Sequence, residues 1–80
     1  MPKINELFAF ISTDEGPEDE GIIASKFGDA WMPLVGADQK RVDSLRPIAK
    51  QIAQATGKRV VLAKFTHRED VETIEAEGEP

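Results

Sequence analysis

The chain has 80 residues, 40% of them apolar, a net charge of −5 and no cysteine. This length fits one small domain and excludes a second, and a core of this size is only marginally sufficient. The lack of cysteine excludes disulfides and thiolate metal sites, so an intracellular location fits better than secretion. Asn5 and Glu6 interrupt an apolar N-terminal stretch that is too short for a signal peptide or a membrane span. We therefore expect a soluble, cytoplasmic protein with no membrane partner.

The charge is distributed unevenly along the chain. Residues 1–20 sum to −5 and residues 69–80 to −6, whereas residues 21–68 carry nine Lys or Arg against three Asp, a net of +6. Negative flanks would repel a polyanion, which argues against binding polymeric nucleic acid. A small anion can still bind a local basic site in the middle of the chain.

Three strands are predicted in the first half of the chain. Residues 4–11 are short and rich in Ile and Phe, which favours an inner strand. Residues 21–27 and 30–35 follow as a second and a third strand, joined by a tight turn at Gly28 and Asp29. Pro33 has no N–H to give to a ladder, so we expect the third strand at a sheet edge or near a bulge. At an edge, Trp31 and Met32 can be reached from outside.

A long amphipathic helix is predicted over residues 38–56. Asp38 is a good N-cap, apolar residues then recur at spacings of three and four, and Gly57 supplies the stop. Pro47 interrupts the pattern because it removes a donor and collides with the carbonyl four residues back. Two outcomes are open: a continuous helix kinked at Pro47, which we favour, and a helix that begins near Asp43 and has Pro47 in its first turn.

The last part of the chain contains the clearest strand, over residues 59–65, which is β-branched. Thr66 and Glu69 then match a capping box, which predicts a short helix over residues 67–75. An extended continuation of the strand is the alternative, since VETIE also contains β-formers. Residues 1–75 are predicted to form the single domain and residues 76–80 a flexible acidic tail.

The order β-β-β-α-β predicts an α+β fold. We expect a four-stranded, mainly antiparallel sheet with one long helix on one face and a short C-terminal helical turn. The other face of the sheet would then leave Ile, Phe and Val side chains open, and such a face on so small a domain is an interaction patch. A homo-oligomer is therefore expected, because association removes further apolar area from water.

The sequence gives little support for catalysis. His67 is the only histidine, and its place beside a helix cap is typical of a surface residue. The serines lack a nucleophile-elbow context, and the many carboxylates lie in acidic stretches that do not hold two of them at a fixed separation. We expect no catalytic residues, no metal and no cofactor.

Trp31 is the best candidate for a binding residue. It is the only tryptophan, it lies on the proline-marked strand, and it comes shortly before the helix N-terminus at Asp38, where unpaired N–H groups favour anions. Aromatic rings stack on bases, and basic side chains pair with phosphate. The predicted ligand-binding set is Trp31, Arg41, Arg46, Lys64, Thr66, His67 and Arg68. The alternative is that Trp31 fills a core or a dimer interface and that the basic residues form a solvated helix face.

The succession of FAFI, an acidic loop, EGIIA, WMPLVGAD, RVDSLRPIAKQIAQATGK and VVLAKFTHREDVETI resembles a group of small proteins of bacteria and their phages. The resemblance covers nearly the whole chain and rests on this pattern, without a catalytic motif. Phage proteins of this size and oligomeric habit include anti-defence sponges, which sequester cyclic nucleotides made by systems such as CBASS, and inhibitors that cap a host protein. The resemblance transfers no site residue.

Two hypotheses of function follow. The first is a non-enzymatic, oligomeric binding protein that sequesters a small anionic ligand such as a cyclic nucleotide, in the bacterial host cytoplasm. The second is a small protein-interaction module or an inhibitor of a host protein, which would use the acidic flanks or the open sheet face.

Overall fold

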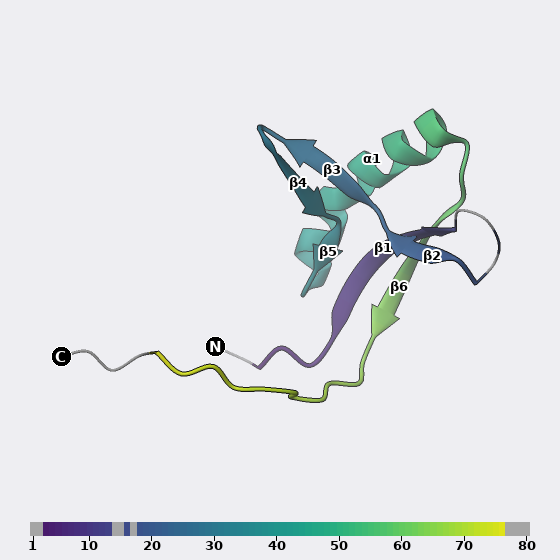
Figure 1. Ribbon diagram of the computed structural model, residues 1–80. Coiled ribbons are helices and arrows are strands. Elements are labelled where there is room, and N and C mark those ends of the chain that lie inside the picture. Colours follow the sequence, from purple (N-terminus) through teal and green to yellow (C-terminus); the bar gives the residue numbers. More distant parts are fainter. Residues whose placement is uncertain (1–2, 14–15, 17, 77–80) are drawn as a thin grey trace.

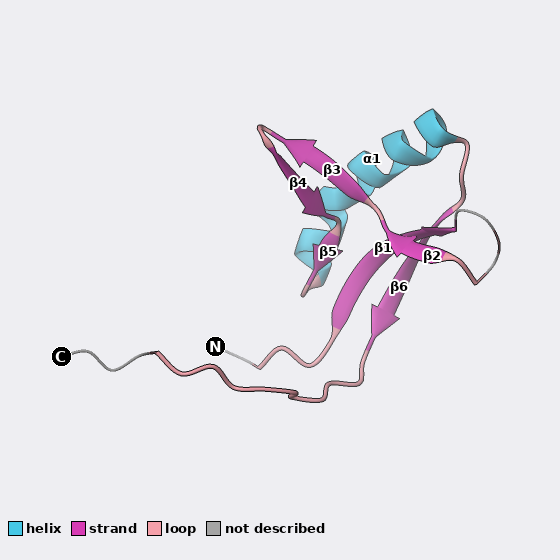
Figure 2. Ribbon diagram, in the orientation of Figure 1, coloured by secondary structure: helices cyan, strands magenta, loops and turns pink. Residues whose placement is uncertain are grey.

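The computed structural model describes residues 3–13, 16 and 18–76, which form an α+β fold with one long helix and antiparallel strands (Figures 1 and 2). The elements run in the order β1 (Leu7–Thr13), β2 (Glu20–Ile22), β3 (Ala24–Phe27), β4 (Ala30–Pro33), β5 (Val35–Gly36), α1 (Gln39–Thr56) and β6 (Val60–Phe65). The predicted β-β-β-α-β order is present, with the second and third strands each divided in two.

β1 is the central strand of a four-stranded sheet. It pairs antiparallel with β6 along one edge, from Leu7↔Phe65 to Ser12↔Val60, and with β2 and β5 along the other. The apolar sequence LFAFI suits this place, because a central strand in a small domain buries more of its side chains than an edge strand. The prediction of an inner N-terminal strand is confirmed.

The two divided strands meet β1 at a junction of three residues, Phe10, Ile23 and Leu34. Phe10 N–H donates to Leu34 O at 3.1 Å, Ile23 N–H donates to Phe10 O at 2.9 Å, and Leu34 N–H donates to Ile23 O at 2.9 Å. All three side chains are buried. The ring of hydrogen bonds satisfies backbone groups that would otherwise be buried without a partner, and it divides each strand at this point.

Beyond the junction, β3 and β4 leave the sheet as a two-stranded ribbon. They pair from Ala24↔Pro33 to Phe27↔Ala30, so Gly28 and Asp29 form a two-residue turn. Gly28 has φ 63° while Asp29 keeps a negative φ, the pattern of a type II′ turn. β4 pairs only with β3, so Pro33 lies at a sheet edge as predicted.

Helix α1 has the caps that the sequence predicts. Asp38 is extended, with φ −147° and ψ 170°, and its carboxylate accepts a hydrogen bond from Arg41 N–H at 2.9 Å. At the other end Gly57 adopts φ 72°, and its N–H donates to Ala53 O at 2.9 Å.

Pro47 lies inside a single helix, so the helix that would begin near Asp43 is wrong. The buried residues of α1 are Val42, Leu45 and Ala49, whereas Pro47 is exposed. Water can therefore hydrate the carbonyl that Pro47 leaves without a helical donor, which explains why the helix continues.

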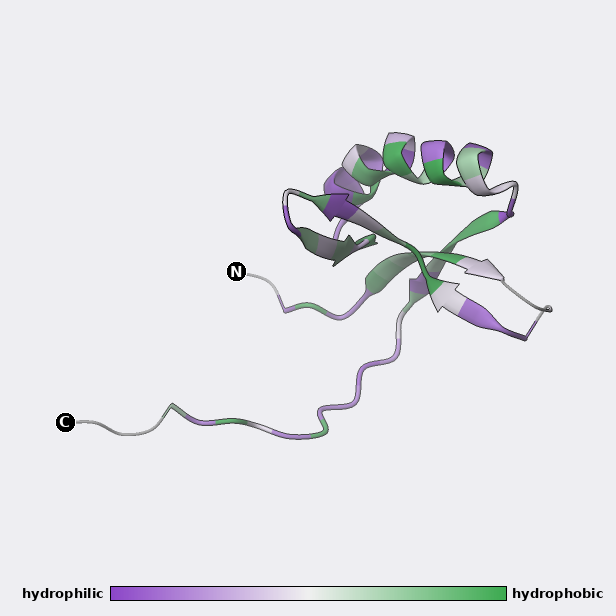
Figure 3. Ribbon diagram, turned by 45° about the horizontal axis from the view of Figure 1, so that its top comes forward, coloured by the Kyte–Doolittle hydropathy of each residue, from purple (hydrophilic) through white to green (hydrophobic). Residues whose placement is uncertain are grey.

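The core lies between α1 and one face of the sheet (Figure 3). It consists of Phe10, Ile23, Leu34, Val42, Leu45 and Ala49, with Phe8, Ile48, Ile52 and Val60 packed around them. Within the described part of the chain, eight apolar residues are buried and eleven large ones are exposed. The single helix therefore covers one face of the sheet and leaves much apolar surface in water.

The short helix predicted over residues 67–75 is wrong. Residues 66–76, called the arm below, contain neither helix nor strand and run away from the helix and the ribbon (Figure 1). A helix of nine residues is marginal without a surface to pack on, and the acidic side chains three residues apart would repel one another along it. Of the predicted acidic tail over 76–80, residues 77–80 lie outside the described part of the chain.

Replacing Pro47 by Ala is expected to stabilise the protein by about 1 to 2 kcal/mol, because it restores a helical hydrogen bond and removes a steric clash. Chemical denaturation followed by circular dichroism measures this change. Gln51→Ala, at another exposed position of α1, is the matched control and should stay within about 0.5 kcal/mol of the wild type. A Pro47→Ala protein no more stable than the control would contradict this account of the helix.

Candidate interaction surface

The face of the sheet opposite α1 has three apolar rows, called the outer face below, and a polar fourth row, Thr13 with Glu20, at one end. Residues directly opposite each other in an antiparallel ladder point to the same face, and Phe8 and Phe10 point to the helix. Their neighbours along β1 therefore point outward, together with the partners of those neighbours. The outer face has three rows: Val61, Ile11 and Ile22; Ala63, Ala9 and Val35; and Phe65 with Leu7.

Large side chains flank a shallow middle row on the outer face. Val61, Ile22 and Phe65 are each 51% exposed and Leu7 is 41% exposed. The middle row is lower because two of its three members are alanines. Polar residues border the face: Thr13 pairs with Glu20 beyond the first row, and His67 and Arg68 follow beyond Phe65. An apolar centre with a polar rim is the anatomy of a protein interface.

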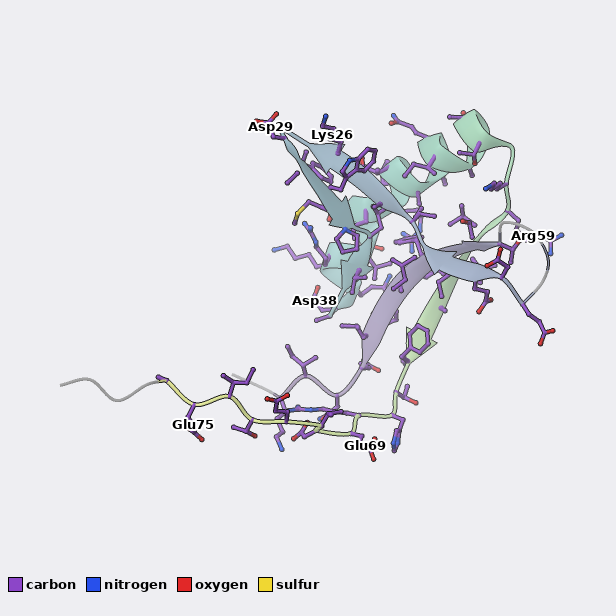
Figure 4. The ribbon with its side chains drawn as sticks, in the orientation of Figure 1. Lys26, Asp29, Asp38, Arg59, Glu69 and Glu75 are labelled. Atoms are coloured by element: carbon purple, nitrogen blue, oxygen red, sulfur yellow. The ribbon has the colours of Figure 1, made fainter. Side chains whose placement is uncertain are left out.

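The arm is attached to the domain at its first residues, and among the described residues no hydrogen bond or ion pair holds residues 71–76 to it. Arg68 Nη1 donates to Ile4 O at 3.1 Å, and Arg68 Nε donates to Asp70 Oδ1 at 2.7 Å. These bonds hold the start of the arm beside the N-terminal segment. Further along, Val71 is 88% and Ile74 84% exposed, and Glu69 and Glu75 lie along the arm far from α1 (Figure 4).

The structure places Trp31 on the ribbon, directly opposite Lys26 and 69% exposed. On the other face of the ribbon, Phe27 and Met32 line a groove with Arg41 and other residues of α1. Trp31 therefore points away from the helix. Its position in the sequence suggests that it lies near the helix N-terminus, but the fold does not bring the two together within one chain. The expectation that Trp31 is reachable from outside is confirmed.

The predicted basic residues are dispersed, and two of them besides Arg68 already have partners. Arg46 Nη1 lies 2.8 Å from Asp43 Oδ1, which also accepts from Gln39 Nε2 at 3.0 Å. These hydrogen bonds, from Gln39 first and then from Arg46, lower the pKa of Asp43. Lys64 Nζ pairs with Glu6 at 3.2 Å and lies 5.9 Å from the centre of the Phe8 ring.

His67 and Arg68 are the two members of the predicted ligand-binding set that one groove contains. This open groove lies between the N-terminal segment and the start of the arm, and it is lined by Ile4, Asn5, Glu6, Leu7, Phe65, His67, Arg68 and Glu69. Thr66 is exposed beside it. The groove continues the outer face, because it shares Leu7 and Phe65 with it.

The described residues contain no group of three or more His, Asp or Glu side chains placed to hold a metal ion. In the same part of the chain, no helix is both long and apolar enough to cross a membrane. His67 lines the groove described above, and no hydrogen bond to its ring is observed in the described residues.

Sequence reasoning anticipated an open sheet face but could not name its members. Which residues of β1 and β6 point outward depends on the register, since a shift by one residue exchanges the two faces. Both strands are apolar on both faces, so their alternation gives no signal. Ile22 and Val61 belong to the interaction surface only because both lie opposite Ile11.

Comparisons of the chain with protein families, with curated proteins and with solved structures found no match. The surface chemistry described above is therefore the basis for assigning a function.

Trp31 is expected to fluoresce as an indole in water, with red-shifted emission and full quenching by acrylamide, at low and high protein concentration. Its 69% exposure is the reason, and the absence of other tryptophans makes the signal specific. Emission that shifts to the blue as the protein concentration rises would instead place Trp31 in an interface between copies.

Proposed function

We propose that the chain is a non-enzymatic protein-interaction module that acts through its outer face and arm. The observation that carries this proposal is the outer face itself, eight apolar residues in register without a charged member, on a chain whose residues are 31% charged. A contiguous apolar patch with a polar rim supports a role in binding protein, because it is costly to leave in water.

The size of the outer face indicates how strongly it can bind. Strands about 4.8 Å apart and rows about 6.8 Å apart give it an area of roughly 300 Å². Burying such an area on both partners contributes about 15 kcal/mol. The loss of translational and rotational freedom costs about 4 to 15 kcal/mol. Burial of the outer face alone is therefore marginal for forming a stable complex. The arm, with Val71 and Ile74 exposed, offers additional contact area.

The acidic ends of the chain support a role in partner choice. The described arm has four Asp or Glu against one Arg, so it would attract a basic partner surface and repel an acidic one. A module of this kind suits an adaptor or an inhibitor that caps another protein in the host cytoplasm, as the resemblance to small bacterial and phage proteins implies.

Val61→Glu is expected to abolish binding through the outer face. A carboxylate buried there without a partner should lower recovery of bound protein at least about 10-fold in a quantitative pull-down from bacterial lysate with the tagged full chain. Trp31→Glu, an apolar-to-acidic change at a still more exposed position on the ribbon, is the control and should leave recovery unchanged. Equal recovery with Val61→Glu and the wild type would overturn the proposal.

A second candidate function, sequestration of a small anionic ligand such as a cyclic nucleotide, is favoured by one observation. Trp31 is exposed on the ribbon with Lys26 directly opposite, so an aromatic face for a base and an ammonium group for a phosphate are adjacent.

Calorimetry against cyclic dinucleotides and trinucleotides tests this second function. Binding by the wild type that is lost in Trp31→Ala and weakened in Lys26→Gln would support it. Absence of heat with every nucleotide, or binding that Trp31→Ala leaves unchanged, would remove it.

A further inference from the structure

The chain exposes more surface than a compact protein of its mass. Its accessible area is 6733 Å², whereas a compact 8.8 kDa monomer is expected to expose roughly 4,800 Å². Its radius of gyration is 15.6 Å, against roughly 12 Å for a compact 80-residue domain. The excess of roughly 1,900 Å² exceeds the ~800 Å² that each partner buries in a standard interface.

Two unpartnered surfaces contribute to this excess, and they adjoin each other. The outer face ends at the row of Leu7 and Phe65, and the arm begins directly after Phe65. Arg68, bound to Ile4 O, fixes the direction in which the arm leaves. The arm then extends away from its own domain (Figure 2), and Val71 and Ile74 on it are 88% and 84% exposed.

From these surfaces we infer that the partner of the outer face is a second copy of the same chain. Two outer faces stack across a two-fold axis, and each arm crosses onto the other copy. This inference rests on the proposed function, because it names the partner of the same surface.

Charge supports a second copy as the occupant. The whole chain carries −5, which would make two copies repel, yet the outer face contributes no charge to the contact. The arm is acidic, whereas residues 21–65 have eight Lys or Arg against three Asp. Four of these bases, Lys40, Arg41, Arg46 and Lys50, lie on α1, on the other side of the sheet, so a crossing arm can pair with exposed bases outside the helix such as Arg59, next to β6.

Shape supports the same arrangement. The middle row of the outer face is low, since it consists of Ala63, Ala9 and Val35, and the rows beside it carry Val61, Ile22 and Phe65. A two-fold axis lets the high row of one copy enter the low row of the other, as facing sheets interdigitate in a sandwich. The outer face supplies roughly 300 Å² per copy, so the arm has to provide the remainder of a standard interface.

Sedimentation equilibrium of the full chain over a range of concentrations tests the inference. The wild type should have twice the 8.8 kDa chain mass. Val61→Glu should raise the dissociation constant at least about 100-fold, because the substitution enters a two-fold interface twice. Val71→Glu combined with Ile74→Glu should raise it about 10-fold or more, by removing the contact of the arm. Trp31→Glu, on the ribbon, should behave as the wild type.

A wild type with the mass of one chain at every concentration would overturn the inference, as would a Val61→Glu protein that remains a dimer or a Trp31→Glu protein that dissociates. Far-UV circular dichroism verifies that each variant is folded, and Ile22→Glu, on a different strand of the same row, replaces Val61→Glu if the latter does not fold.

The proposed function and the inferred dimer can be disproved separately. A monomeric wild type that still binds other proteins through Val61 overturns the inference alone, and a dimer that binds no other protein leaves the inference standing and limits the module to self-assembly.

Discussion

Three backbone hydrogen bonds among Phe10, Ile23 and Leu34 determine how the chain can cover its own core. Each of these residues is buried, so its N–H and C=O groups need hydrogen-bond partners. A regular ladder pairs only two strands, whereas three strands meet here. The ring of bonds supplies these partners at the point where the second and third predicted strands stop pairing with β1 and begin to pair with each other. The ribbon thereby reaches beside α1, where Phe27 and Met32 approach the helix.

One helix cannot cover both faces of the sheet that this junction supports. The face toward α1 contains Phe10 and packs against the buried side of the helix, where the core cluster lies. On the opposite face Ala9 and Ile11 are buried between their neighbours, but Leu7, Ile22, Val61 and Phe65 stay exposed to water, although an 80-residue domain has a small free energy of unfolding. Charge is sparse on this face: the acidic groups are concentrated at the ends of the chain, and among the paired strand residues only Glu20, opposite Thr13, brings an acidic group to its edge.

The fold class, the inner first strand, the helix with its caps and the edge position of Pro33 could be predicted, because each depends on residues close together in sequence. The junction could not, since Ile23 and Leu34 look like ordinary members of continuous strands until β1 lies between them. The prediction of a helix after Thr66 was wrong because a capping box stabilises only the start of a helix, and a helix this short also needs a surface to pack on. Trp31 was correctly expected to be accessible, but it faces away from α1, which carries Arg41 and Arg46, and Lys64 lies on β6 opposite Phe8.

The pairing of the first strand with the last has a consequence for synthesis in the cell. β6 supplies Val61, Ala63 and Phe65 to the outer face, and it pairs with β1, whose residues lie about fifty positions earlier in the chain. A nascent chain still lacking β6 can form α1 and the ribbon from local contacts, but it presents no complete outer face. We therefore expect nascent chains on neighbouring ribosomes of one messenger RNA to be protected from premature association, since the outer face is complete only once the last strand has been made.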